Sequence, residues 1–337
     1  MTMADREKAR ASAPTIYDIA SLAGVSASTV SRALNKPGRI NAETASRIQQ
    51  AADQLGYRTN PMARSLQTGL TGNLALVVSD LTNPVYFNLV RGAERVTAEA
   101  RSMLLFADSQ EDGAVEAEAA DRLLRVADGL ILVGSRLADE EIVALSNIKP
   151  VVVVNRVVEG VAGVTVETSA GARAIVQHLH SLGHRHIAYV PGPAASWMNA
   201  RRSEAIISAA AELGIVVRSV ASSGPTVDGG RFAVPGILET GATAVVAYND
   251  LLAFGVIHGL RGTGAHVPAD VSVVGFDDIF GSELLTPSLT TVRSPLAQLG
   301  ESAVKLLQLQ IAGSAQVTTD QLSTELIVRD STGPAAS

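Results

Sequence analysis

The sequence has no cysteine. That absence excludes disulfide bonds, thiolate metal sites and cysteine nucleophiles, and it is compatible with a reducing compartment. The chain also lacks any stretch approaching about eighteen uninterrupted apolar residues, and its start, MTMADREKARASAP, has no apolar run like a signal-peptide core. We therefore expect a cytoplasmic protein with no membrane contact.

A net positive charge is missing as well. The formal charge of −6 argues against a uniformly basic coat for nucleic acid. Residues 1–70 nevertheless hold nine Lys or Arg and five Asp or Glu, which is +4, and the rest of the chain holds 18 basic and 28 acidic residues, which is −10. This asymmetry predicts that only the N-terminal part meets a polyanion.

Beyond residue 72, short apolar runs rich in Val alternate with amphipathic helical stretches. The runs include LALVVSD, DGLILVG, PVVVVNR and AVVAYND. Uninterrupted apolar strands between helices are typical of parallel sheets buried on both faces, and about eight such units in a chain of 337 residues predict two open α/β subdomains. In such sheets, ligands bind outside the carboxyl ends of the strands.

Three helices are expected in the first sixty residues. Thr15 can cap the first and Gly24 can end it, Ser26 can cap the second, and Asn41 or Thr44 can open a third that stops at Gly56. The second is short and carries small polar residues, GVSASTVSRALN. Two helices joined by a glycine turn, the second polar near its start, are typical of a helix-turn-helix.

Small side chains would let this second helix approach base edges, and an arginine can grip O6 and N7 of guanine. Its exposed face is predicted to be Ala27, Ser28 and Arg32, with three hydroxyl residues on the flanks that can donate to phosphates: Ser26, Thr29 and Ser31. The alternative interpretation is a surface helix of an ordinary bundle, in which Ser and Thr are merely caps.

The segment YRTNPMARSLQTG that follows is short, basic and amphipathic, and it would be a poor isolated helix. If it folds on DNA, Leu66 can enter a minor-groove step while Arg64 and Asn60 reach phosphates or groove edges. A plain interdomain tether is the alternative.

The N-terminal part closely resembles the DNA-binding headpiece and hinge of the lactose-repressor (LacI/GalR) family of bacterial transcription regulators, over TIYDIASLAGVSASTVSRALNKPGRINAETASRIQQAADQLGYRTNPMARSL. The likeness continues through VSDLTNPVYFNLVRGAE, LGHRHIAYVPGP and AVVAYNDLLAFGVIHGLRGTGAHVPADVSVVGFDD. It implies an all-α helix-turn-helix headpiece over 14–59, a hinge or linker over 60–70, and a two-lobe periplasmic-binding-protein-like α/β core with parallel sheets over 72–331. The N-lobe would comprise about 72–170 plus 294–322, and the C-lobe about 171–293 plus 323–331.

The resemblance implies a repressor that binds near-palindromic operator DNA as a homodimer, and that associates with the nucleoid when bound. Ala27, Ser28 and Arg32 fall on base-reading positions, and Ala63 and Leu66 fall on the hinge positions that enter the minor groove. Six residues fall on positions that mostly contact phosphates: Thr15, Tyr17, Ser26, Thr29, Ser31 and Asn35.

The core's resemblance implies a small-molecule effector, a carbohydrate, in the cleft between the lobes. Asn249 and Asp277 lie on positions that hydrogen-bond sugar hydroxyls in many relatives, which suits a polyol because each side chain can take part in two hydrogen bonds. Tyr86 lies at a position that is often aromatic, and Trp197 could lay its indole on a sugar face.

The sequence departs from the family pattern at two of the effector positions. Counted from Gly192, the family's ligand-gripping arginine falls on Ala200. Either the loop is locally shifted and Arg201 replaces that arginine, or the arginine contact is missing. Asn155 stands where relatives often carry aspartate.

No metal, cofactor or catalytic residue is predicted. Asp277 and Asp278 are adjacent at a strand end and should point apart, and the histidines of QHLHSLGHRH are better explained by a helix end than by a zinc site. We therefore expect no enzyme. A sugar-binding transport component would need a signal peptide, and a sugar-modifying enzyme with a regulatory domain would need a nucleophile, metal or cofactor loop.

Overall fold

The computed structural model describes residues 14–35, 39–57, 69–314 and 317–336. The contacts within the chain divide it into two units, residues 1–71 and residues 72–337. Each unit has its own hydrophobic core.

The first unit contains the helices α2 (Ile16–Ala23), α3 (Ala27–Asn35) and α4 (Ala42–Leu55). Its core is small and closes around Ile19, Val30 and Ile48, all of which are fully buried. Gly24 and Gly56 end α2 and α4 in the left-handed conformation, and Asn41 caps α4 by accepting a hydrogen bond from Thr44 N. The predicted helix ends at Gly24 and Gly56 and the predicted cap at Asn41 are therefore confirmed.

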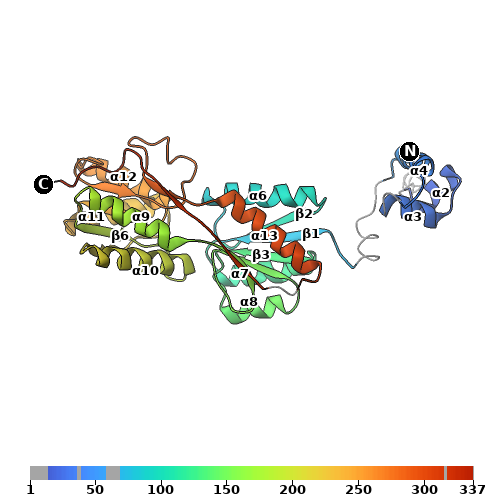
Figure 1. Cartoon of the computed structure of the whole chain (residues 1–337), viewed down its shortest axis with the longest axis horizontal. Helices are drawn as coiled ribbons and strands as arrows, with labels where there is room; N and C mark the ends of the chain where they lie inside the picture. Colours follow the sequence, from blue (N-terminus) through green and yellow to red (C-terminus); the bar gives the residue numbers. More distant parts are fainter. Residues whose placement is uncertain (1–13, 36–38, 58–68, 315–316, 337) are drawn as a thin grey trace, which may run out of the picture. The chain divides into compact units, whose positions relative to one another are not determined.

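The second unit begins with a lobe built on a six-stranded parallel sheet (Figure 1). We call it the N-lobe. Helices α6 (Val85–Glu99) and α13 (Leu296–Ile311) pack on one face of this sheet, and α7 (Gly113–Leu124) and α8 (Asp139–Ser146) pack on the other. The strands, in spatial order, are β11 (Thr319–Leu322), β5 (Ala162–Val166), β4 (Val151–Val154), β3 (Gly129–Val133), β1 (Asn73–Val78) and β2 (Met103–Asp108).

The C-lobe has a four-stranded parallel sheet with the order β7 (Val216–Ser219), β6 (His186–Val190), β8 (Ala244–Ala247) and β9 (Ser272–Val274). Helices α11 (Val227–Glu239) and α12 (Asp250–Thr263) cover one face, and α9 (Thr168–Ser181) and α10 (Trp197–Glu212) cover the other (Figure 1). A short antiparallel pair, β10 (Thr291–Arg293) with β12 (Glu325–Ile327), packs beside α9.

The chain passes between the lobes after β5, between β10 and α13, and between β11 and β12. The predicted α/β class with two parallel sheets is confirmed. The sequence did not predict β7, β10, β11 or β12, because these strands are short and polar or exposed: β11 reads TDQL and β7 reads VVRS. None of the helices in the described residues is long and apolar enough to cross a membrane.

Candidate functional site

The face of α3 that was predicted to be exposed is mostly so. Ser28 and Arg32, one helical turn apart, are exposed, whereas Ala27 is half-buried and packs against the core of the first unit. Val30 is fully buried and anchors the opposite side of the helix. An exposed serine and an exposed arginine thus share one face of a short, firmly anchored helix.

The neighbouring hydroxyl groups bind one another and the backbone. Ser26 Oγ lies 2.9 Å from Ser28 Oγ and 2.8 Å from Thr29 Oγ1, and it accepts a bond of 3.2 Å from Thr29 N. Thr15 donates through its backbone N and its Oγ1 to Asp18 Oδ2, at 2.7 Å each, at the start of α2. The capping role considered as an alternative is therefore present, and it leaves the hydroxyls at the surface.

The remaining predicted DNA-binding residues divide into two groups. Tyr17 is 71% exposed and Ser31 is half-buried. The side chain of Asn35 lies outside the described residues, as do four whole residues: Asn60, Ala63, Arg64 and Leu66.

The second unit contains a cavity of about 50 Å³ between the carboxyl ends of the two sheets. This is the place where the strand pattern predicted a ligand site. The lining residues include Tyr86, Asn155, Trp197, Asn249 and Asp277, which are five of the six predicted effector residues. Its charged lining residues are Glu111, Arg136, Arg202 and Asp277.

Strained backbone gathers at this cavity. The described residues other than glycine that have positive φ are Arg101, Gln110, Glu111, Asn155, Asp277 and Asp278. Three of them line the cavity, and Gln110 and Asp278 adjoin lining residues in the sequence. Such conformations cost about 1 kcal/mol or more each and persist where the surroundings enforce them, often at binding sites.

Tyr86 reaches the cavity from the first turn of α6. Its hydroxyl lies 2.6 Å from Ser79 Oγ, at the end of β1. Burial raises the pKa of Tyr86 above its ordinary value, so the phenol stays neutral. It therefore presents an aromatic ring with its polar end already bonded.

Asn249 and Asp277 are both buried, and both already have protein partners. Asn249 caps α12: its Oδ1 accepts from Leu252 N at 2.9 Å, and its Nδ2 donates to Pro225 O at 3.0 Å. Asp277 Oδ1 accepts from Arg202 Nη2 at 2.5 Å. A sugar hydroxyl would have to join these bonds rather than find free groups.

The arginine that α10 contributes to the cavity is Arg202, whereas the sequence favoured Arg201. The side chain of Arg202 is only 5% exposed; its Nη1 donates to Tyr248 O at 2.5 Å, and its guanidinium lies 3.9 Å from the centre of the Phe276 ring. Arg201, on the outer side of α10, pairs with Glu204 at 3.1 Å and lies 5.6 Å from the Trp197 ring centre. Ala200 is exposed, so one residue of helix rotation decides which side chain points inward.

Helical periodicity could have identified Arg202. It lies four residues after Met198 and four before Ile206, and both of these are buried. An arginine on the apolar face of an amphipathic helix must have a buried partner, and Asp277 supplies it. Trp197, at the start of α10, is half-buried and packs against the N-lobe core.

Asn155 lies at the end of β4 with φ of 57°. Its backbone N donates to Val164 O at 2.9 Å, and its Oδ1 is buried without a hydrogen-bond partner among the described residues. An unpaired buried acceptor on a cavity wall marks a position where a ligand donor would be favourable.

A buried carboxyl group next to the cavity escaped the sequence analysis. Asp250 is fully buried and accepts hydrogen bonds from Ile279 N, Ser282 Oγ and Thr291 Oγ1. Burial, with the charge of Asp277 adding to it, raises the pKa of Asp250 to about 7.

The residues weighed as metal ligands have structural partners. Asp278 accepts from Arg293 and Arg329, at 2.7 Å each, away from Asp277. His184 is buried between Thr243 Oγ1 and Ser272 Oγ. Within the described ranges no three His, Cys, Asp or Glu side chains are placed to hold a metal ion.

Comparisons with known proteins agree with this architecture. Residues 15–60 match the bacterial regulatory proteins of the lacI family, and residues 176–332 match a periplasmic binding protein-like domain. The HTH-type transcriptional regulator GalS of Salmonella typhimurium is 32% identical over 323 residues, which cover 94% of this chain and 95% of that protein.

Two solved structures are similar over nearly the whole chain. The lac repressor dimer bound to operator and the anti-inducer ONPF has a TM-score of 0.85 at 25% identity, covering 95% of this chain and 99% of that one. The transcriptional regulator CelR in complex with cellobiose has a TM-score of 0.71 at 28% identity, covering 94% and 99%. This chain therefore belongs to the lacI family of bacterial regulatory proteins and is a DNA-binding transcriptional regulator.

Proposed function

We propose that this regulator is a repressor that binds a near-palindromic operator as a homodimer, and that a small carbohydrate in the cavity changes its operator affinity. The observation that carries the proposal is the pairing of an exposed Ser28–Arg32 face on α3 with a cavity at the carboxyl ends of two sheets. We assign 14–59 to the headpiece, 60–70 to the linker and 72–331 to the core. The lac repressor dimer bound to operator and the CelR–cellobiose complex support this assignment.

The proposed control is a shift in population. An effector that binds one arrangement of the two lobes better than another changes the fraction of molecules competent for the operator, by no more than its difference in affinity for the two arrangements. The cavity of about 50 Å³ is smaller than typical ligand pockets of roughly 300–1,000 Å³, so the lobes must part to admit a sugar.

The test begins with selection of bound duplexes from a random DNA library by the full-length chain, and an inverted repeat should be enriched. Fluorescence anisotropy with that duplex then measures affinity with and without added sugars. A chain lacking residues 1–70 should lose duplex binding and keep its thermal response to the sugar. If the full-length chain enriches no repeat, the proposal is wrong.

A further inference from the structure

Two arginine–carboxylate pairs face the cavity, one from each lobe. Glu111 and Arg136 belong to the N-lobe, and Asp277 and Arg202 belong to the C-lobe. These are the charged residues that line the cavity, and their formal charges cancel. An anionic ligand is repelled by the two carboxylates as well as attracted by the two arginines, whereas a neutral ligand can add hydrogen bonds to both pairs without adding charge.

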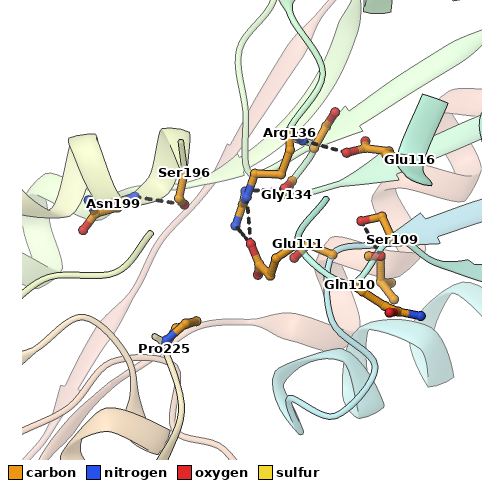
Figure 2. Close-up of polar contacts among 12 residues, drawn as sticks. Ser109, Gln110, Glu111, Glu116, Gly134, Arg136, Ser196, Asn199 and Pro225 are labelled. Atoms are coloured by element: carbon orange, nitrogen blue, oxygen red, sulfur yellow. Dashed lines mark hydrogen bonds and ion pairs between the residues drawn. The ribbon is translucent and has the colours of Figure 1, made fainter. Parts of the chain in front are cut away.

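The N-lobe pair is held rigidly. Arg136 donates from Nε to Glu111 Oε2 at 2.8 Å and from Nη1 to Gly134 O at 2.5 Å, and its backbone N donates to the buried carboxylate of Glu116 at 2.7 Å (Figure 2). The Arg136 side chain is 7% exposed, and that of Glu111 is 28% exposed. Glu111 therefore keeps part of its carboxylate available at the cavity wall.

The loop that carries Glu111 is strained. Gln110 and Glu111 are consecutive and have φ of 53° and 62°, a conformation that is rare for residues other than glycine. Glu111 N donates to Ser79 O at 2.6 Å, and Asp112 caps the following helix by accepting from Ala114 N at 2.7 Å. Anchors on both sides of the loop thus hold the Glu111 side chain against Arg136 at the cavity.

The opposite wall comes from the C-lobe. Ser196, at the start of α10, and Pro225 line the same cavity, and Figure 2 shows them across from the Glu111–Arg136 pair. Ser196 Oγ lies 3.2 Å from Tyr248 Oη. A ligand held between these walls meets a carboxylate acceptor and a guanidinium donor side by side, which suits two adjacent hydroxyl groups.

We infer, on the basis of the proposed function, that Glu111 and Arg136 are specificity-determining residues: they select an uncharged polyhydroxy effector with adjacent hydroxyls and reject phosphorylated sugars. Glu111 accepts from one hydroxyl, and Arg136 donates to the next. The cancelled charge of the cavity gives a phosphate no unpaired cation there to bind.

The first experiment measures thermal stability of the full-length chain with aldopentoses, aldohexoses, cellobiose and inositol, and with glucose 6-phosphate and ribose 5-phosphate. At least one neutral compound should raise the melting temperature, and neither phosphate should. The inference is overturned if only a phosphate stabilises the chain, or if no neutral compound does.

The second experiment uses calorimetric titration with the neutral compound that binds. Glu111→Gln should weaken its binding by about 10- to 100-fold, because a charge-assisted hydrogen bond is lost. This variant should also reduce the difference in affinity between the sugar and its phosphate, because the cavity gains one net positive charge. Glu111→Asp keeps the negative charge, so it should weaken binding of the sugar without strengthening binding of the phosphate. Arg125→Gln, in an exposed pair with Asp121 on the same lobe, is the matched control.

Monodeoxy analogues of that sugar separate contact from a general structural effect. One analogue should bind the wild type more weakly than the parent sugar does, because it lacks the hydroxyl that is the partner of Glu111. The Glu111→Gln variant should bind this analogue and the parent sugar about equally well. If Glu111→Gln does not fold, Arg136→Lys takes its place in the same series. If the folded variant discriminates among the sugar, its phosphate and the deoxy analogues as the wild type does, this inference alone is overturned. Failure of the wild type to bind any operator overturns the proposed function.

Discussion

Replacing Arg202 by Met should destabilise the core severely, because it leaves the carboxylate of Asp277 buried without its partner. Both side chains are almost inaccessible, at 5% and 8%, and the Nη2–Oδ1 distance is 2.5 Å. Breaking a buried ion pair by removing one partner costs about 3–5 kcal/mol. In a domain of this size each kcal/mol corresponds to about 2–4 °C, so the melting temperature should fall by roughly 6–20 °C.

Arg201→Met is the matched control, one residue away on the same helix. Arg201 is 51% exposed and its pair with Glu204 is at the surface, so less than about 1 kcal/mol should be lost after solvent screening. Thermal and urea unfolding of both variants, followed by circular dichroism, gives the comparison. Equal losses in the two variants would refute the argument that Arg202 is the inward residue.

The pH dependence of the Arg202→Met loss identifies its cause. Burial already raises the pKa of Asp277, and without the guanidinium the pKa rises further. A carboxyl whose folded pKa is raised destabilises the folded state increasingly as pH rises through that range. The loss should therefore be larger at pH 8 than at pH 5, and adding Asp277→Asn should recover part of it at pH 8. A loss that does not vary with pH would mean that packing alone is responsible.

Three further predictions follow from other parts of the chain. Arg32→Ala should weaken operator binding by roughly 5- to 150-fold in anisotropy titrations, which is the value of one bidentate contact to guanine. Arg122→Ala, which changes a side chain on α7 that is 68% exposed, should not weaken operator binding. In urea unfolding, Gly255→Ala should lower stability by at least about 1–3 kcal/mol, because a Cβ there would meet Val227 O at 2.0 Å. Gly262→Ala is the control and should be neutral or stabilising, because a Cβ there would have no atom within 4 Å. Because the pKa of Asp250 in the folded state is raised to about 7, ionisation of this group should lower the stability of the wild type as pH rises from about 4 to 7. Asp250→Asn should make stability less dependent on pH over this range. If stability depends on pH equally in the two proteins, the raised pKa is contradicted.

Local chemistry explains why the headpiece helices could be predicted from sequence. Thr15, Gly24 and Asn41 act on residues within four positions along the chain, so a capping residue or a glycine specifies a helix end without tertiary information. The central strands of the core were equally visible, because a strand buried on both faces is continuously apolar. β11 was not, since TDQL carries neither alternation nor hydrophobicity and its place is set by pairing with β5.

The cavity could be predicted only in part, because its walls depend on contacts between distant residues. The family resemblance pointed to Asn155, Asn249 and Asp277, which lie at or near strand ends, and the structure brings them to one cavity. Glu111 could not be predicted as a cavity residue, since no sequence pattern marks a loop in which two residues other than glycine adopt the left-handed backbone conformation. Arg202 was missed by counting along a family pattern, although the periodicity of α10 marks it as inward-facing.

The distribution of charge suggests how the two lobes are held together. Every ion pair within the described residues joins side chains of the same lobe, including Glu111–Arg136 and Asp277–Arg202. The contact between the lobes includes Trp197, Met198 and Tyr248, which pack against the N-lobe core. Parting the lobes therefore exposes apolar surface but breaks no ion pair, and apolar contacts are not directional. A neutral ligand that bonds to both pairs would add a directional link between the Glu111–Arg136 and Asp277–Arg202 pairs, and its hydroxyl geometry would then select one arrangement of the lobes over others.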